Sequence, residues 1–220
     1  MTLAACITTC NEAESIGALV LGLRALGLGV YVTDAGSEDG TPFIARQCGA
    51  YVEELTRIPI STGLLRAWDV ALADGNSLIV QIDAGGSHDI ADLPFLVSAL
   101  ASHDMVCGSR FLKGSQYIGP LWRKAGSRLA TAMCNAKTGG RFSDWTSGYR
   151  AFRAVALDKL EVDLLEDKHL AQGHFFQAQV LAHAWKMGLR IAEVPIAYHA
   201  GRSSLSPSVA WEAVRGWARL

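Results

Sequence analysis

The sequence predicts one α/β domain over residues 1–220, with a mixed, mostly parallel central sheet flanked by helices. Two observations predict this class. Short apolar runs of strand length alternate with longer segments of helical periodicity, as in β-α-β units joined by right-handed crossovers. The run from Leu78 to Ile82 is rich in β-branched residues, which suits a strand buried on both faces of a parallel sheet.

The first half of the chain alternates regularly. Residues 4–9 predict the first strand. Residues 14–26 carry Ile16, Val20 and Leu23 at helical spacing, which predicts a helix. The same reasoning predicts strands at 30–33, 50–52, 78–82 and 105–108, and helices near 42, at 63–73 and at 92–100.

The second half is less regular. A basic amphipathic helix is expected at 122–136, before a polar and aromatic segment at 142–153. The polar stretch 163–174 is expected to be a mobile loop over the site. The remaining elements expected are a helix at 175–187, a strand at 190–195 and a final helix at 211–220.

Composition excludes several classes of protein. The formal net charge is -1 without a basic excess, so no nucleic acid is expected as a partner. The five cysteines form no CxxC pair, which indicates reduced thiols and a cytoplasmic protein. The sequence lacks a signal-peptide pattern and any run of about 18 uncharged apolar residues, so no membrane-spanning helix is expected.

Two acidic loops end neighbouring strands of the predicted sheet. Asp83 follows the buried strand 78–82 on a glycine turn, where open α/β sheets bind ligands. Asp34 begins a second loop, 34–41. Carboxylates accept hydrogen bonds from nucleoside hydroxyls, and with a metal they bind a diphosphate. The alternative is that Asp34 and Asp39 only form a turn and cap a helix. Neither loop carries the glycine patterns of dinucleotide or P-loop sites, which disfavours an oxidoreductase.

Several motifs, in order, resemble one family. Thr8 to Glu12, Asp34 to Thr41 and Ile82 to Asp89 resemble the opening strand, nucleotide loop and metal loop of family-2 inverting glycosyltransferases of the GT-A (Rossmann-like) fold. Gly108 to Phe111 and Asp144 to Arg150 resemble the polyprenyl-phosphate branch, which includes dolichol-phosphate mannose synthases. Further matches lie at 123, 127, 175–177, 191–196 and 202–206.

The resemblance implies that a sugar moves from a GDP- or UDP-sugar to a polyprenyl phosphate, with inversion. It implies a nucleotide-sugar half at about 1–108 and an acceptor half at about 109–205. The residues implied to bind the nucleotide are Thr9, Asn11, Glu12, Asp34, Asp39, Arg66 and Asp83. Those implied to bind the acceptor phosphate are Arg110, Arg123, Ser127 and Arg150, and those implied to act in catalysis are Asp83, Arg110 and Asp144.

Two departures from the family pattern bear on the implied divalent cation, Mg²⁺ or Mn²⁺. Ala35 replaces an acid in the nucleotide loop, and Gly85 stands where the second acid of the D-x-D metal motif is expected. Asp83 is then the one strong ligand of the loop, with Ser87 and His88 as weak ones. Mg²⁺ binds through one or two carboxylates plus substrate phosphates, so we expect weaker metal binding rather than none.

The acceptor chemistry can be argued from the residues. A phosphate monoester is largely dianionic near neutral pH, because its second pKa is about 6. It needs cations to hold it, and arginine does so bidentately. An orienting role is therefore expected for Asp144, with general base catalysis as the alternative. Lys124 and Arg128 add charge near Arg123, or form a solvated helix face.

The end of the chain suits a helix lying on a membrane surface, at 208–220, because Trp211 and Trp217 alternate there with basic residues. The alternative is an ordinary packing helix. We therefore expect a protein peripheral to the cytoplasmic face of a membrane, with a separate membrane-anchoring partner as one arrangement. Two other functions stay open: the same fold with a non-lipid saccharide acceptor, and a catalytically silent subunit that binds nucleotide sugars.

Overall fold

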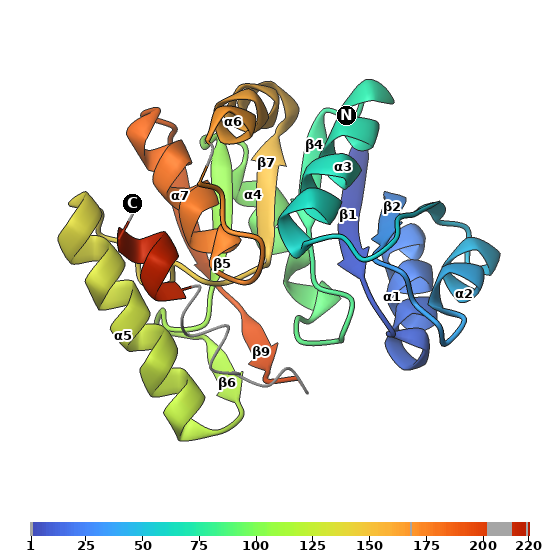
Figure 1. The fold of residues 1–220 in the computed structure, drawn as a ribbon, viewed down its shortest axis with the longest axis horizontal. Helices are drawn as coiled ribbons and strands as arrows, with labels where there is room; N and C mark the ends of the chain where they lie inside the picture. Colours follow the sequence, from blue (N-terminus) through green and yellow to red (C-terminus); the bar gives the residue numbers. More distant parts are fainter. Residues whose placement is uncertain (1, 168, 202–212, 219) are drawn as a thin grey trace.

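The central sheet has seven strands in the order β3-β2-β1-β4-β7-β5-β8 (Figure 1). The computed structural model describes residues 2–167, 169–201, 213–218 and 220. All neighbours in the sheet are parallel except β7, which pairs antiparallel with both β4 and β5. The strands are β1 (Leu3–Thr9), β2 (Gly29–Asp34), β3 (Tyr51–Glu54), β4 (Leu78–Gln81), β5 (Met105–Ser109), β7 (Arg150–Arg153) and β8 (Ile191–Pro195).

Helices cover both faces of this sheet, and each face has its own hydrophobic core. The helices are α1 (Ala13–Ala25), α2 (Thr41–Gln47), α3 (Ile60–Ala73), α4 (Leu93–Ala99), α5 (Leu121–Thr138), α6 (Ala154–Glu166) and α7 (Phe176–Lys186). Side chains of α1, α2 and α4 form one core, and those of α3, α6 and α7 the other. The strands feed both cores by alternation: Ala4 and Cys6 of β1 face α3, while Ala5 and Ile7 face α1.

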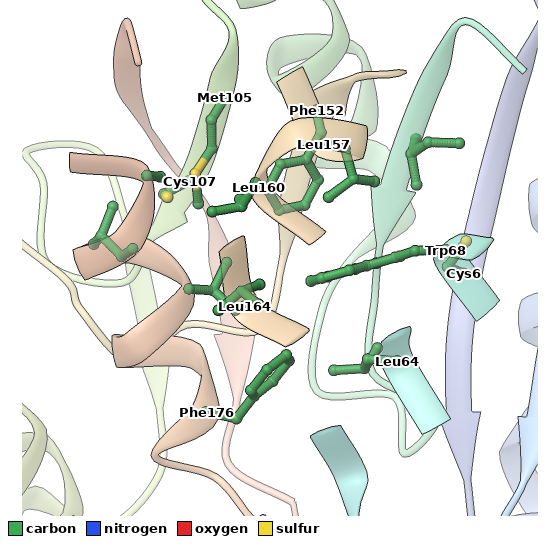
Figure 2. Close-up of a cluster of buried hydrophobic side chains, with 14 of the residues drawn as sticks. Cys6, Leu64, Trp68, Met105, Cys107, Phe152, Leu157, Leu160, Leu164 and Phe176 are labelled. Carbon is green, nitrogen blue, oxygen red and sulfur yellow. The ribbon is translucent and has the colours of Figure 1, made fainter. Parts of the chain in front are cut away.

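Trp68 of α3 lies at the centre of the second core (Figure 2). Its ring centroid lies 5.6 Å from that of Phe152 on β7 and 6.0 Å from that of Phe176 on α7. Leu160 and Leu164 of α6 belong to the same cluster. One aromatic side chain therefore joins an early helix to a strand and a helix from the second half of the chain.

The predicted fold class is confirmed, but three strands and the helix α6 were not expected. The segment 142–153 was not expected to contain a strand, yet β7 inserts between β4 and β5. Its sequence, RAFR, is four residues long and half arginine, so it lacks an apolar strand signal. Strands β6 (Gln116–Ile118) and β9 (Ala197–His199) form a separate two-stranded sheet.

Helix α6 corrects the expectation of a loop that begins at 163. The helix extends to Glu166, and its buried Leu157, Leu160 and Leu164 have the spacing of one helical face. Acidic residues stand between these leucines in the sequence, and they obscure the apolar face. His174, between α6 and α7, lines the candidate site described below.

The described part of the terminal segment packs on the protein. Residues 213–218 are helical. Trp217 donates from Nε1 to the Met133 carbonyl of α5 at 3.1 Å and packs against the second core. This contact supports the packing helix over the surface helix. Trp211 and the motif at 202–206 lie outside the described residues. No helix in the described part of the chain is long and apolar enough to cross a membrane.

Candidate active site

A cleft of about 1080 Å³ opens at the carboxyl ends of β1 and β4. In a parallel sheet this edge gathers the loops that follow the strands, as expected for a ligand site. The cleft is also lined by the start of α3, by residues 146 and 148 before β7, and by residues 174 and 177 at the start of α7. Of the residues predicted from sequence, those that line it are Thr9, Asn11, Glu12, Asp39, Asp83 and Ser87.

Asp34 anchors its own loop. It is buried, and its Oδ1 accepts from the backbone N–H groups of Gly36 and Ser37 at 3.0 and 2.7 Å. Its Oδ2 accepts from Ser37 Oγ. Both carboxylate oxygens are therefore used within the loop, and this geometry favours the turn-forming role for Asp34.

Asp39 joins the nucleotide loop to the start of α1. Its Oδ1 accepts from the N–H and hydroxyl of Thr41, and its Oδ2 accepts from the Ala13 N–H at 3.0 Å. The Thr41 hydroxyl is the largest of the hydrogen-bonding effects that lower the pKa of Asp39. Asn11 completes the junction, because its Oδ1 accepts from the Glu38 N–H at 2.9 Å. The two loops form one rigid wall of the cleft.

Asp83 lies on the floor of the cleft, and its side chain is half exposed. His88 Nε2 lies 3.1 Å from Asp83 Oδ2, and the His88 ring packs between Tyr149 and Tyr198. Partial burial raises the pKa of Asp83, but the hydrogen bond and charge of His88, with His174 and Arg110, bring it below its usual value. Asp83 is thus an oriented, ionised carboxylate.

The predicted metal ligands can be tested against this arrangement. Ser87 lines the cleft with Asp83. His88 is buried and does not line the cleft, and its Nε2 contacts Asp83. A Cβ built on Gly148 would lie 2.6 Å from Asp83 Oδ1, so a glycine there leaves room for the carboxylate. Among the described residues no three acidic, histidine or cysteine side chains gather as ligands. The oxygens present fit Mg²⁺ or Mn²⁺ shared with substrate phosphates.

Arg110 and Asp144 form a buried ion pair beside the cleft. Arg110 Nε and Nη2 donate to Asp144 Oδ2 and Oδ1 at 2.6 and 2.8 Å, and the Arg110 N–H donates to Oδ2 at 3.1 Å. Burial raises the pKa of Asp144, but the charge and hydrogen bonds of Arg110 outweigh it and hold that pKa low. Arg110 Nη2 also donates to Thr146 Oγ1 at 2.6 Å, and Thr146 lines the cleft.

The Glu193 carboxylate holds the segment that carries Asp144. Glu193 of β8 accepts from the N–H groups of Ser143 and Asp144 at 2.8 and 2.9 Å. Burial raises the pKa of Glu193, in spite of these hydrogen bonds. The segment that carries Asp144 is therefore fixed to the sheet through β8, and the position of Arg110 is fixed with it.

Arg123 and Ser127 lie on α5, and Arg123 reaches toward the cleft. Its Nη1 donates to the Gly201 carbonyl at 2.8 Å, and Gly201 lines the cleft. The Arg123 Nε is buried without a hydrogen-bond partner in the described residues. Ser127 is half-buried one helical turn later.

Two arginines do not lie where the sequence predicted. Arg150 of β7 is fully buried, and it donates to the carbonyls of Ser147 and Trp145. It positions the loop before β7 and is not exposed to an acceptor phosphate. Arg66 of α3 lies outside the cleft lining and pairs with Glu53 and Asp69 at the surface. Their motif positions gave no information on which way either side chain points.

Several lining residues were absent from the predicted site, and Arg57, His174 and Gln177 are among them. Arg57 has a φ of 52°, in the left-handed region that few non-glycine residues adopt. No sequence pattern marks it. Gln177 is held by Gln81, whose Nε2 donates to its Oε1 at 2.9 Å. A glutamine within the otherwise apolar strand was a signal that could have located this wall of the cleft.

The family follows from comparison with known proteins. The profile of the family described as Glycosyl transferase family 2 matches residues 4–161, so the chain belongs to that family and is a glycosyltransferase. A protein named undecaprenyl-phosphate mannosyltransferase from Micrococcus luteus is 31% identical over 94% of this chain and 89% of its own length. A dolichyl-phosphate hexose transferase from Haloferax volcanii is also 31% identical, over 93% of this chain and 87% of its own.

Solved structures support the fold alone. Glucosyl-3-phosphoglycerate synthase from Mycobacterium tuberculosis, solved with Mn²⁺ and UDP-glucose among other ligands, superposes on 97% of this chain and 76% of its own with a TM-score of 0.71. The sequence identity is 20%. This likeness confirms the predicted GT-A architecture.

Proposed function

We propose that this glycosyltransferase moves a sugar from a nucleotide-diphosphate sugar to a polyprenyl phosphate, with inversion at the anomeric carbon. The observation that carries the proposal is the Arg110–Asp144–Thr146 arrangement. It places a buried, fixed guanidinium one side chain away from the cleft that holds Asp83. The names of the relatives above point to the same acceptor class.

The acceptor half of the reaction needs positioning more than proton transfer. A phosphate monoester already carries most of its second negative charge near neutral pH. Arg110 and Arg123 supply cations on one side of the cleft, and correct placement of the nucleophile can supply a large part of the rate. Asp144 holds Arg110 with both oxygens and is fully buried. It acts as an orienting residue in this proposal.

The donor half uses the opposite wall. The rigid junction of the nucleotide loop with α1 faces the ribose and base, with Asn11 and Asp39 on its surface. Asp83 would hold the divalent cation, Mg²⁺ or Mn²⁺. When bound, that cation neutralises the leaving nucleoside diphosphate. Arg57 and His174 line the same space and add positive charge or hydrogen bonds near the leaving group.

We also propose that the protein works at the cytoplasmic surface of a membrane, where its acceptor lies. Helix α5 supports this better than the chain end does. It exposes Leu121, Trp122 and Leu129 at 80%, 58% and 63%, with Lys124 and Arg128 on the same helix. Figure 1 shows α5 at the edge of the molecule far from α1 and α2. Apolar and basic side chains together favour a membrane surface carrying anionic lipid.

The experiment is an incubation with polyprenyl phosphate and a panel of GDP- and UDP-sugars, read by mass spectrometry of the lipid. A sugar-phosphate lipid with one donor supports the proposal and identifies the base and sugar. Product with a soluble saccharide acceptor alone would support the alternative of a non-lipid acceptor. Folded protein that binds a nucleotide sugar without any product would support the silent subunit, for which Ala35 and Gly85 are the argument.

A further inference from the structure

We infer that Glu12 supplies the second carboxylate of the cation site, in place of the acid that position 85 lacks. The inference rests on the proposed function, because it concerns the cation that holds the donor diphosphate. It assigns a metal ligand to the loop before α1, a different part of the chain from the loop that carries Asp83.

The geometry around Gly85 carries the inference. A Cβ built on Gly85 would lie 3.1 Å from Glu12 Oε1 and 3.5 Å from Glu12 Oε2. The carboxylate of Glu12 therefore lies next to the space that a side chain at position 85 would enter. Glu12, Gly85 and Asp83 all line the same cleft.

The backbone directs Glu12 to this place. Asn11, before it, has a φ of 57° and turns the chain, and the Glu12 N–H donates to Thr41 Oγ1 at 2.9 Å. Glu12 occupies the N-cap position of α1, yet its side chain makes no capping hydrogen bond to the helix backbone. An N-cap carboxylate ordinarily accepts from the first turn. Here it is directed into the cleft instead.

The Glu12 carboxylate has one oxygen left to bind a cation. Ser15 Oγ donates to Glu12 Oε2 at 3.3 Å, and within the described residues no hydrogen bond is made to Oε1. Hard divalent cations take oxygen ligands, and Mg²⁺ sites commonly use one or two carboxylates plus phosphate oxygens. With Asp83 and Glu12 the cleft offers two carboxylates that such a cation could share. The missing acid of the loop is thereby replaced from α1.

The test measures Mn²⁺ affinity directly, by electron paramagnetic resonance titration of free Mn²⁺ in the presence of GDP or UDP. Glu12→Gln keeps the shape and removes the charge, and it should weaken Mn²⁺ binding by at least about tenfold. Adding Gly85→Asp to the Glu12→Gln variant should restore the Mn²⁺ affinity, because it places a new carboxylate next to the position of the Glu12 carboxylate. Glu54→Gln is the matched control: it removes the same charge from an exposed side chain of β3 that does not line the cleft, and it should leave the affinity unchanged.

Three outcomes would overturn the inference. If Glu12→Gln binds Mn²⁺ as the parent does while Asp83→Asn loses it, the cation site stands without Glu12. If sugar transfer to polyprenyl phosphate continues with a chelator, the cation role fails and the proposed function survives. Circular dichroism of each variant checks folding. The Gly85→Asp single variant tests the inference independently. That variant adds a third carboxylate and should bind Mn²⁺ more tightly than the parent; unchanged affinity contradicts the placement.

Discussion

Replacing Asp144 by Asn tests whether this carboxylate orients Arg110 or acts as a base. The change keeps the size of the side chain and removes the charge that faces a guanidinium only 8% exposed. The carboxylate accepts from Arg110 N, Nε and Nη2 and from the Thr146 N–H at 2.6 to 3.1 Å. Breaking one partner of such a buried pair costs about 3–5 kcal/mol.

This cost is large enough to measure and small enough to leave a folded protein. A single domain is stable by about 5–15 kcal/mol, and for a chain of this size the loss lowers the Tm by about 10 °C. Urea unfolding followed by tryptophan fluorescence gives the free energy of unfolding of parent and variant. Activity should fall with it, mainly through a raised KM for the acceptor, because Arg110 loses its fixed position.

The control is the exposed pair of Asp104 with Arg190. It has the same bidentate contacts, at 3.0 and 2.8 Å, but Arg190 is 63% exposed. Asp104→Asn should cost less than about 1 kcal/mol, because water screens the pair. If Asp144→Asn costs no more than this control and yet abolishes kcat, Asp144 is a base and the orienting argument is wrong.

Three further outcomes follow from the structure. Burial raises the pKa of Glu161 to about 7. The free energy of unfolding of the parent should therefore fall as pH rises from about 4.5 to 7, by at most about 3 kcal/mol. Glu161→Gln should remove that fall, as measured by urea titrations at several pH values. His88→Phe keeps the ring between its tyrosines and loses the contact to Asp83, which should weaken Mn²⁺ binding about tenfold or more by spin-resonance titration. Gly63→Ala places a methyl 2.6 Å from Thr8 Cγ2 and should destabilise by about 1–3 kcal/mol in thermal unfolding; an unchanged Tm would show that α3 shifts freely on β1.

Much of the fold could be predicted because its signals are local. The runs that became β1, β2 and β4 are apolar, and glycines end the helix between the first two. The insertion of β7 could not be predicted, because RAFR carries no strand pattern of its own. It is placed by pairing with β4 and β5 on both sides, which is information from the tertiary structure.

The candidate site was predictable where it depends on position along a strand. Asp83 and Asn11 follow strands at one edge of the sheet, so their meeting in a cleft follows from the parallel topology. Side-chain direction was not predictable in the same way. Arg150 begins a strand and points into the core, while Arg66 lies on the exposed side of α3. Motif position places a residue on an element but does not say which face of that element it occupies.

Glu12 and Gly85 are a different case. The sequence shows that an acid is missing at position 85, but only the structure shows which carboxylate lies next to that position. Sequence alone indicates a missing ligand at position 85. The contact distance to Glu12 Oε1 indicates a replacement, because only the fold brings the start of α1 to the end of β4.

The measurement that tests the central claim most directly compares two acceptors of equal chain length, polyprenyl phosphate and polyprenol, with the same donor. Products are quantified by mass spectrometry of the lipid fraction. Because arginines are held beside the cleft, we expect product from polyprenyl phosphate and none from polyprenol. Polyprenol lacks the phosphate dianion, which supplies both the charge that the arginines bind and the nucleophilic oxygen. Equal product from polyprenol would contradict the account, because the phosphate would then contribute neither binding nor nucleophile.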